Sequence, residues 1–257
     1  TAEAIGSRAW GLAERTAADL CALPNLQIPL VSVIIRSMAR PTLAEALAAV
    51  ALQTYPAVEV VLVKALGAAH PDLLPWCGRF PLRAVGNGQP LARVAAANAG
   101  LQAARGQYLL FLDDDDTLDP PHLSALVAAL QHQKRYQAAY AGVRAVDAAG
   151  VPLGPVWHQI YDGLWLKYSN YLPIHAVLFH RELLAKGCAF DAQFDLYEDW
   201  DFWLQLAEYT DFLRVDQVSA SYRAGGDSQG GAVRDVQARV ADQERERQMR
   251  ARLYDKW

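Results

Sequence analysis

Short apolar runs alternate with helix-forming segments through the first 150 residues of the chain. The runs are LVSVII at 30–35, VEVVLV at 58–63, PLRAV at 81–85, QYLLFL at 107–112 and QAAYAGVRAV at 137–146. Strands that alternate with helices form βαβ units, so this pattern predicts an α/β domain with a mostly parallel sheet flanked by helices. Ligands bind such sheets beyond the carboxyl ends of the strands.

The segments between these runs carry helix signals. Thr42 and Glu45 have the spacing of a capping box, and Leu43, Leu47 and Val50 fall on one face of the helix that would follow. This pattern predicts a helix within residues 39–53 that packs against the sheet.

Two further helices are expected between the later runs. One covers 90–106 and is closed by Gly106. The other is opened by Asp119-Pro120-Pro121, with Asp119 as its cap, and runs to about residue 133.

Four consecutive aspartates, Asp113 to Asp116, directly follow the fourth apolar run. Adjacent carboxylates repel each other, and burial increases that cost, so a cation, helix dipoles or water must offset it. Carboxylate oxygens are the ligands of Mg²⁺ and Mn²⁺, and Asp113 and Asp115 are spaced to reach one ion. The alternative is a solvated acidic turn. Either way, the charge is expected at the binding edge of the sheet.

The pattern changes after residue 150. Residues 156–180 are rich in aromatic side chains and show no clear period. A short helix that ends at Gly187 and an acidic helix at 197–209 follow. Two short strands are then expected at 212–216 and 218–223, and a long charged helix at 231–254.

Glu198 and Asp199 open the acidic helix. Carboxylates in a first turn are stabilised by the helix dipole, which is one explanation for them. The other is a catalytic base beside the aromatic side chains of Trp200, Phe202 and Trp203.

Aromatic residues of the 156–180 segment are candidates for stacking on a ligand; the alternative is packing over the sheet. They are Trp157, Tyr161, Trp165, Tyr168 and Tyr171. His175 precedes an apolar run and is interpreted as a packed or ligand-facing residue rather than a metal ligand, because the six histidines lack metal-ligand spacing.

Bulk properties exclude several classes of function. The net charge of −4 gives no basis for nonspecific nucleic-acid binding. Three scattered cysteines form neither a disulfide framework nor a metal site, which fits a reducing compartment. With no signal peptide and no 18-residue apolar run, we expect a cytoplasmic protein. The chain starts at Thr1, as expected of a piece of a longer protein.

The order of the motifs is more specific than any one of them. Strand, capped helix and strand are followed by A-x-N-x-G (Ala96, Asn98, Gly100), then ARGQYLLFLDDDD at 104–116, then EDWDFW at 198–203. Over residues 28–225 this order resembles the family 2 glycosyltransferases. The resemblance implies a Rossmann-like mixed sheet of the GT-A type, with a nucleotide-sugar half at 28–150 and an acceptor half at 151–225. A helical extension at 1–27 and a C-terminal helix at 226–257 are expected to flank this domain.

The resemblance also implies roles for particular residues. Asp115 and Asp113 match the D-x-D pair that holds Mn²⁺ or Mg²⁺ and the donor diphosphate. Asp199 matches the general base of an inverting displacement, with Glu198 beside it. Further donor contacts are expected from Arg36, Arg93 and Asn98, and acceptor contacts from Trp200, His175 and Trp165.

The chain departs from the family pattern at the nucleotide pocket. Lys64-Ala65-Leu66-Gly67 stands where the family usually has an aspartate that reads the nucleotide base. Ala97 stands where the family has an arginine, and Arg93 is a candidate to supply the missing positive charge. Tyr222-Arg223 is not followed by the histidine that many members have. The donor base is therefore open, with UDP or dTDP favoured.

Three functions remain in competition. The leading one is an inverting, metal-dependent glycosyltransferase that acts on a glycan or glycolipid acceptor in surface polysaccharide or similar synthesis. The second is a degenerate GT-A domain that binds a glycan or serves as a scaffold in a larger synthase. The third is a nucleotidyltransferase, which Glu198-Asp199 disfavours. The terminal helix is interpreted as a solvated face, with docking to a partner domain or a peripheral membrane contact as alternatives.

Overall fold

The computed structural model describes residues 28–224 and 236–257. The strands are β1 Val31–Ser37, β2 Val58–Lys64, β3 Trp76–Cys77, β4 Phe80–Val85, β5 Tyr108–Asp113, β6 Thr117–Leu118, β7 Ala138–Val146, β8 Pro152–Trp157, β9 Val177–His180 and β10 Phe212–Arg223. The α-helices are α2 Leu43–Ala51, α3 Arg93–Ala103, α4 His122–His132, α5 Gly163–Tyr168, α6 Glu198–Ala207 and α7 Val236–Lys256. Three short 3₁₀ helices cover Gly67–Ala69, Ile174–Ala176 and Arg181–Lys186.

These strands form one ten-stranded mixed sheet with the order β3-β4-β2-β1-β5-β9-β7-β10-β6, and β8 pairs with β7. The ladders that join β4, β2, β1 and β5 are parallel, as is the ladder between β7 and β10. Strand β9 runs antiparallel to both of its neighbours. The predicted α/β fold with a mixed sheet is therefore confirmed, with antiparallel insertions in its second half.

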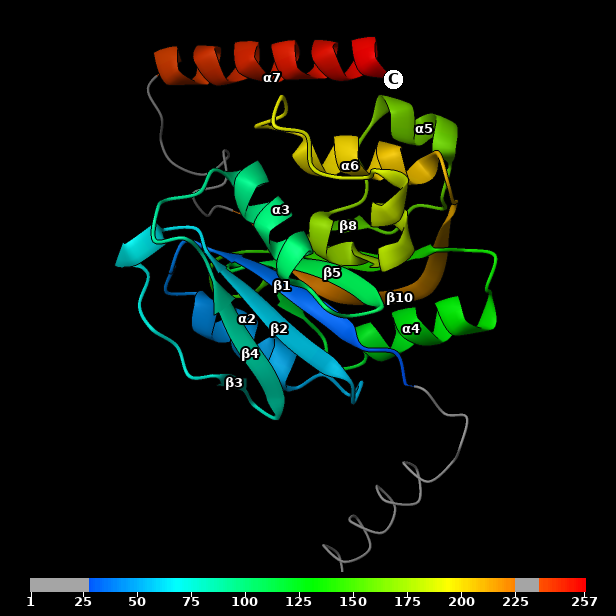
Figure 1. The fold of residues 1–257 in the computed structure, drawn as a ribbon. Coiled ribbons are helices and arrows are strands. Elements are labelled where there is room, and N and C mark those ends of the chain that lie inside the picture. The colour runs from blue at the N-terminus through cyan, green and yellow to red at the C-terminus, as the bar shows by residue number, and fades with distance from the viewer. Residues whose placement is uncertain (1–27, 225–235) are drawn as a thin grey trace, which may run out of the picture.

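Helices cover both faces of the sheet. In Figure 1, α3 and α6 lie above the sheet, whereas α2 and α4 lie below it. Strands β1, β2 and β5 are buried on both faces, which is why their sequences are continuous apolar runs. The opening of the pocket described below lies at the carboxyl ends of β1 and β5.

The second half of the sheet differs from expectation in two places. Residues 212–223 form a single strand, β10, whose pairing with β7 shifts register between Arg214 and Ala220, so the two expected strands are one irregular strand. The aromatic segment at 156–180 contains the end of β8, helix α5 and strand β9. These elements are too short to give a periodic signal.

The predicted capping box of α2 is wrong. The backbone of Thr42 is already helical, at φ −70° and ψ −13°, and its side chain makes no cap hydrogen bond. Glu45 instead forms an ion pair with Arg223, which lies at the end of β10. A partner distant in sequence has taken the carboxylate that the local motif would use.

Two expected helix ends also differ. Helix α3 ends at Ala103, and Gly106 lies beyond it, where a Cβ atom would come within 2.5 Å of the Ser32 backbone nitrogen. This glycine therefore permits the close approach of the chain to β1 and does not cap the helix. The Asp119 carboxylate does not cap α4 but pairs with Arg144.

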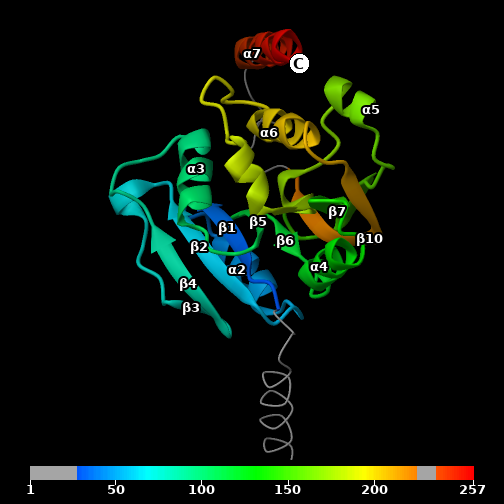
Figure 2. The same ribbon diagram turned by 45° about the vertical axis from the view of Figure 1, so that its right-hand side comes forward.

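Helix α7 packs across α6 at the top of the molecule in Figure 1 (Figure 2 shows it end on). Its buried side chains include Met249 and Leu253. The helix expected near the N-terminus and the residues just before α7 lie outside the described ranges. Within those ranges, none of the helices is both long and apolar enough to cross a membrane.

Candidate active site

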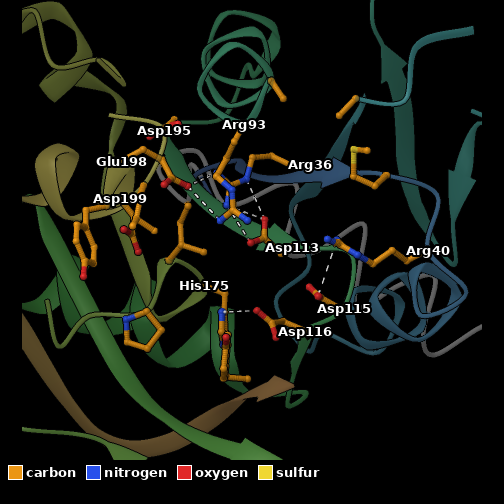
Figure 3. A pocket seen from close by; sticks show the side chains of 18 of the residues that line it. Arg36, Arg40, Arg93, Asp113, Asp115, Asp116, His175, Asp195, Glu198 and Asp199 are labelled. Carbon is orange, nitrogen blue, oxygen red and sulfur yellow. Dashed lines mark hydrogen bonds and ion pairs between the residues drawn. The ribbon is translucent and has the colours of Figure 1, made fainter. Parts of the chain in front are cut away.

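A pocket of about 550 Å³ opens at the carboxyl ends of β1 and β5 (Figure 3). Its walls come from the end of β1, the residue after β2, the start of α3, the aspartate turn after β5, the segment before β9, the start of α6 and the end of β10. Lining side chains include Arg36, Arg40, Arg93, Asp113, Asp115, Asp116, Asn170, His175, Glu198 and Asp199. The expected binding edge of the sheet is thus hollow and densely charged.

Asp113 is neutralised by Arg36, which stands opposite it in the β1–β5 ladder. The Nε and Nη2 atoms of Arg36 each donate to the Asp113 carboxylate at 2.9 Å. Burial would raise the pKa of Asp113, but Arg36 and then Arg93 outweigh it and hold that pKa below its usual value. Asp113 therefore stays ionised and fixed in orientation.

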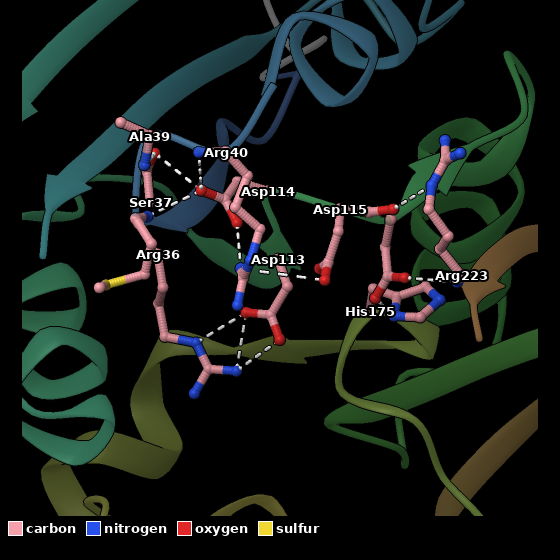
Figure 4. A network of polar contacts seen from close by, with 11 residues as sticks. Arg36, Ser37, Ala39, Arg40, Asp113, Asp114, Asp115, His175 and Arg223 are labelled. Carbon is pink, nitrogen blue, oxygen red and sulfur yellow. Dashed lines mark hydrogen bonds and ion pairs between the residues drawn. The ribbon is translucent and has the colours of Figure 1, made fainter. Parts of the chain in front are cut away.

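Asp114 anchors the loop between β1 and α2 (Figure 4). Its Oδ2 accepts from the Ser37 hydroxyl at 3.0 Å and from the Met38 backbone nitrogen at 2.7 Å. Its Oδ1 forms an ion pair with Arg40. Because this side chain is completely buried and fully engaged, it serves structure and is not available to a ligand.

Asp116 closes the far end of the aspartate turn. Its Oδ1 accepts from the Arg223 backbone nitrogen at 2.9 Å, and its Oδ2 lies 3.1 Å from His175 Nδ1. Burial lowers the pKa of His175, but the negative charge of Asp116 more than reverses this and raises it. The Asp116 carboxylate thus favours the protonated form of the His175 imidazole on the pocket wall.

Asp115 lacks a comparable partner. Among the described residues its nearest cation is Arg40, at 3.8 Å, and its carboxylate accepts no hydrogen bond. Burial, followed by the charges of Asp116 and Asp113, raises the pKa of Asp115 to about 6. Oxygens of these three aspartates lie within 4.8 Å of one another. Carboxylate oxygens are hard ligands, and Asp115 has no close positive partner. The three carboxylates therefore fit a divalent cation such as Mn²⁺ or Mg²⁺.

Glu198 and Asp199 face this cluster from the start of α6, and their environments differ. Oε1 of Glu198 accepts from Arg36 at 3.0 Å and from Arg93 at 3.4 Å (Figure 3). Asp199 accepts from Asn170 Nδ2 at 3.1 Å and from the Trp200 backbone nitrogen at 2.8 Å. Burial, then the neighbouring charge of Glu198, raises the pKa of Asp199 to about 7. Asp199 can therefore exchange a proton near neutral pH.

The residue before this pair is held in an uncommon conformation. Tyr197 has a positive φ of 65°, which is rare for a residue with a side chain. Its hydroxyl donates to Glu246 at 2.9 Å and accepts from Arg250 at 3.3 Å, and both partners lie on α7. Helix α7 thereby holds the turn that aims Glu198 and Asp199 into the pocket.

Most of the site residues expected from the sequence meet in this pocket. They are Arg36, Arg93, Asp113, Asp115, His175, Glu198 and Asp199. Arg93, which lies one helical turn before the missing arginine, does bring a positive charge to the pocket.

Three expected residues lie outside the pocket. Asn98 exchanges two hydrogen bonds with the Phe190 backbone, which ties α3 to the loop before α6. Trp200 is buried in the core and donates to the Leu166 carbonyl at 2.5 Å. Trp165 is 55% exposed on α5. None of the three lines the pocket, and the side chains of Asn98 and Trp200 are engaged elsewhere.

The sequence reasoning missed several residues that shape the site: Arg40, Asp116, Asn170, Tyr197 and Arg223. Asp116 was visible as part of the aspartate run. The others carry no local signal, because their partners lie far away in the sequence.

Comparison with known proteins agrees with this geometry. The sequence model described as glycosyl transferase family 2 matches residues 32–187, more than half of the chain. The uncharacterized glycosyltransferase YwdF of Bacillus subtilis is 25% identical over 199 residues, which cover 75% of this chain and 73% of YwdF. The O-antigen biosynthesis protein RfbC of Myxococcus xanthus is 28% identical over 194 residues, or 71% of this chain but only 15% of RfbC.

Solved structures support the fold. TarS 1-349 of S. aureus in complex with UDP-GlcNAc superposes with a TM-score of 0.63 at 18% identity, covering 79% of this chain and 60% of TarS 1-349. The mannosyltransferase PcManGT of Pyrobaculum calidifontis, in complex with GDP-Man and Mn²⁺, gives a TM-score of 0.56 at 18% identity over 88% of this chain and 68% of PcManGT. The chain thus spans less than two thirds of the TarS 1-349 structure.

Proposed function

Because the chain belongs to glycosyl transferase family 2, we propose that its pocket transfers a sugar from a nucleotide-sugar to a hydroxyl of a glycan or lipid-linked acceptor, with inversion at the anomeric carbon. One observation supports this most directly. Two carboxylates with raised pKa values, Asp115 and Asp199, line the same pocket from opposite elements. Asp115 is suited to metal coordination, and Asp199 is suited to proton transfer.

The aspartate turn would bind the metal and the donor diphosphate. Asp115 would be the main ligand, with Asp113 and Asp116 beside it. When bound there, Mn²⁺ or Mg²⁺ supplies stabilisation of the negative charge on the leaving diphosphate. Arg36 keeps Asp113 ionised and oriented, and Arg93 adds positive charge at the pocket wall.

Asp199 would act as the general base. Its raised pKa matches the task of removing a proton from an attacking hydroxyl near neutral pH. Glu198 is held by two guanidinium groups, so it is better suited to position Arg36 and to keep the pKa of Asp199 high. In an inverting displacement the base lies on the face opposite the leaving group. The carboxylates that bind the metal and the carboxylate that acts as base must therefore be separate groups.

We propose that residues 28–150 supply the donor contacts and residues 151–225 most of the acceptor contacts. The wall where a base-reading aspartate is usual is formed here by Ala65 and Leu91. Lys64 points to Asp72, whose carboxylate it contacts at 2.8 Å. This apolar wall favours base recognition by shape and apolar contact, and it keeps open the alternative of a degenerate module that only binds a glycan.

Calorimetric titration with UDP, GDP, dTDP and CDP, each with and without Mn²⁺, tests the proposal. We expect one nucleotide to bind only when Mn²⁺ is present, and its nucleotide-sugar to be turned over. Asp115→Asn should abolish this binding, whereas Asp216→Asn, which alters a carboxylate that is 89% exposed, should not.

Two results would contradict the proposal. Nucleotide binding that is equal with and without Mn²⁺ would remove the metal role of the aspartate turn. A folded protein that binds none of the four nucleotides would favour the degenerate glycan-binding module.

A further inference from the structure

A second, smaller hollow of about 160 Å³ opens beside the main pocket. It is lined by Trp157, Asn170, Pro173 and Tyr222. All of these except Trp157 also line the main pocket, so the two hollows adjoin. The side hollow is therefore an extension of the proposed active site toward β8 and β10.

Two aromatic rings form the walls of this side hollow. Trp157 ends β8 and Tyr222 lies in β10, and strand β7 pairs with both strands. The rings meet edge to face, with centroids 5.7 Å apart and planes at 84°. Both side chains are half-buried, so part of each ring stays accessible. Aromatic faces carry negative potential and attract the weakly positive C–H groups of a sugar ring.

Polar groups complete the side hollow. Asn170 donates from Nδ2 to Asp199 Oδ2 at 3.1 Å, so a residue of this wall is in direct contact with the proposed base. Within residues 28–224 and 236–257, the Tyr222 hydroxyl forms no hydrogen bond. A small site with aromatic faces, a carboxamide and a hydroxyl suits a compact ligand that has both C–H faces and hydroxyl groups.

We propose that this side hollow is the acceptor subsite and that it binds one pyranose ring of a glycan. The inference rests on the proposed glycosyl transfer. The sugar lies in the corner that the Trp157 and Tyr222 rings form, with its C–H face against one of them, and presents one hydroxyl to Asp199. That hydroxyl gives its proton to the Asp199 carboxylate while its oxygen bonds to the anomeric carbon of the donor. The bond from this carbon to the diphosphate breaks at the same time, and the diphosphate leaves with the electron pair.

The shape and lining of the side hollow favour a sugar over an acyl chain as its ligand. A lipid tail needs a long apolar groove, whereas this hollow is short and has Asn170 in its wall. The assignment also moves the acceptor contacts away from Trp165 and Trp200, which lie outside both hollows.

Saturation-transfer NMR with methyl pyranosides of glucose, galactose, mannose, rhamnose and N-acetylglucosamine tests the subsite, with octanol as a lipid-like probe. We expect at least one pyranoside to receive saturation through its ring C–H protons. Trp157→Leu should weaken that binding by about five- to tenfold, because the aromatic face is lost. Trp165→Leu removes a tryptophan outside the hollow and is the matched control. Tyr222→Leu is a second test from the adjoining ring, and circular dichroism checks that each variant is folded.

Nucleotide titration with Mn²⁺ on the same samples separates the two levels of the proposal. If a nucleotide binds but no pyranoside does, or if Trp157→Leu and Tyr222→Leu both retain the pyranoside, the subsite is wrong and the donor site stands. Saturation of octanol without any pyranoside overturns the sugar assignment in favour of a lipid. If a pyranoside binds but no nucleotide does, the proposed transfer fails and the hollow is no acceptor subsite.

Discussion

Asp115 differs from its three neighbours because they have close partners that neutralise or hydrogen-bond them. Asp113 has Arg36, Asp114 has Arg40 and Asp116 has the Arg223 backbone nitrogen. The repulsion within the run is thus relieved residue by residue, and the charge that remains without a close partner is that of Asp115, which lines the pocket beside Asp113 and Asp116.

We expect Asp115→Asn to stabilise the fold while it removes metal binding. The pKa of Asp115 is raised from 3.8 to about 6, so the stability that the protonated group contributes is lost as the pH rises through 6. At pH 7.5 the uncharged amide should therefore raise the free energy of unfolding by about 1 to 2 kcal/mol. Urea unfolding with and without Mn²⁺ measures both effects. If the variant is stabilised by Mn²⁺ as strongly as the wild type, Asp115 is not the main ligand.

The acid limb of the pH profile should report Asp199. A base with a raised pKa is protonated as the pH falls through about 7, so kcat/KM should fall below that pH. Glu198→Gln removes the charge that helps to raise this pKa and should move the limb to lower pH by about one unit. Initial rates of nucleoside diphosphate release from pH 5 to 9 give the profile. A limb that does not move in Glu198→Gln would assign the titration to another group.

At the scale of elements, α7 is attached to α6 through a buried charge. Asp201, in the first turn of α6, is completely buried. It pairs with Lys256 at 2.9 Å and accepts from Trp257 Nε1 at 2.8 Å. Burying this carboxylate would be costly without the end of α7, so the two helices are stable together.

Lys256→Met should therefore reduce the free energy of unfolding by about 2 to 3 kcal/mol, because it leaves Asp201 without its cation. Lys256→Arg keeps the charge and should lose far less. Arg252→Met changes an exposed charge on the same helix and should have almost no effect. Guanidinium denaturation of the three variants provides the comparison, and equal stability of Lys256→Met and Lys256→Arg would refute the argument.

Elements with strong local signals were predictable, and those defined by distant partners were not. The apolar runs of β1, β2 and β5 and the acidic start of α6 are visible in the sequence. Strand β9 has only four residues, and its place between β5 and β7 depends on pairing with both. Local signals also failed at Thr42 and Asp119, whose expected caps are absent because Glu45 and Asp119 pair with distant arginines.

The same distinction applies to the site. The identities of Asp113, Asp115 and Asp199 follow from motifs, but their different protonation behaviour depends on Arg36, Asn170 and the burial of each group. Trp157 and Tyr222 stand 65 residues apart by their numbers, and they meet only because β8 and β10 both pair with β7. No local pattern could have joined them.

For the whole molecule, the pocket draws on segments from β1 to β10, so donor binding should stabilise the entire fold. A nucleotide with Mn²⁺ at about 100 times its dissociation constant should add about 2.7 kcal/mol and raise Tm by about 5 to 10 °C. Differential scanning fluorimetry measures the shift, and Asp115→Asn should abolish it. A shift of the same size in that variant would place nucleotide binding elsewhere.

The contacts of Arg223 determine when the aspartate turn can be completed during protein synthesis. Its backbone nitrogen holds Asp116 across a separation of 107 residues, and its side chain reaches the Asp115 carbonyl and Glu45. On the ribosome, the four aspartates are translated roughly 5 to 20 s before this arginine. During that interval the nascent chain carries four adjacent carboxylates without the hydrogen bonds that Arg223 later provides. The proposed donor and metal site is therefore completed only late in synthesis, after Arg223 has been translated.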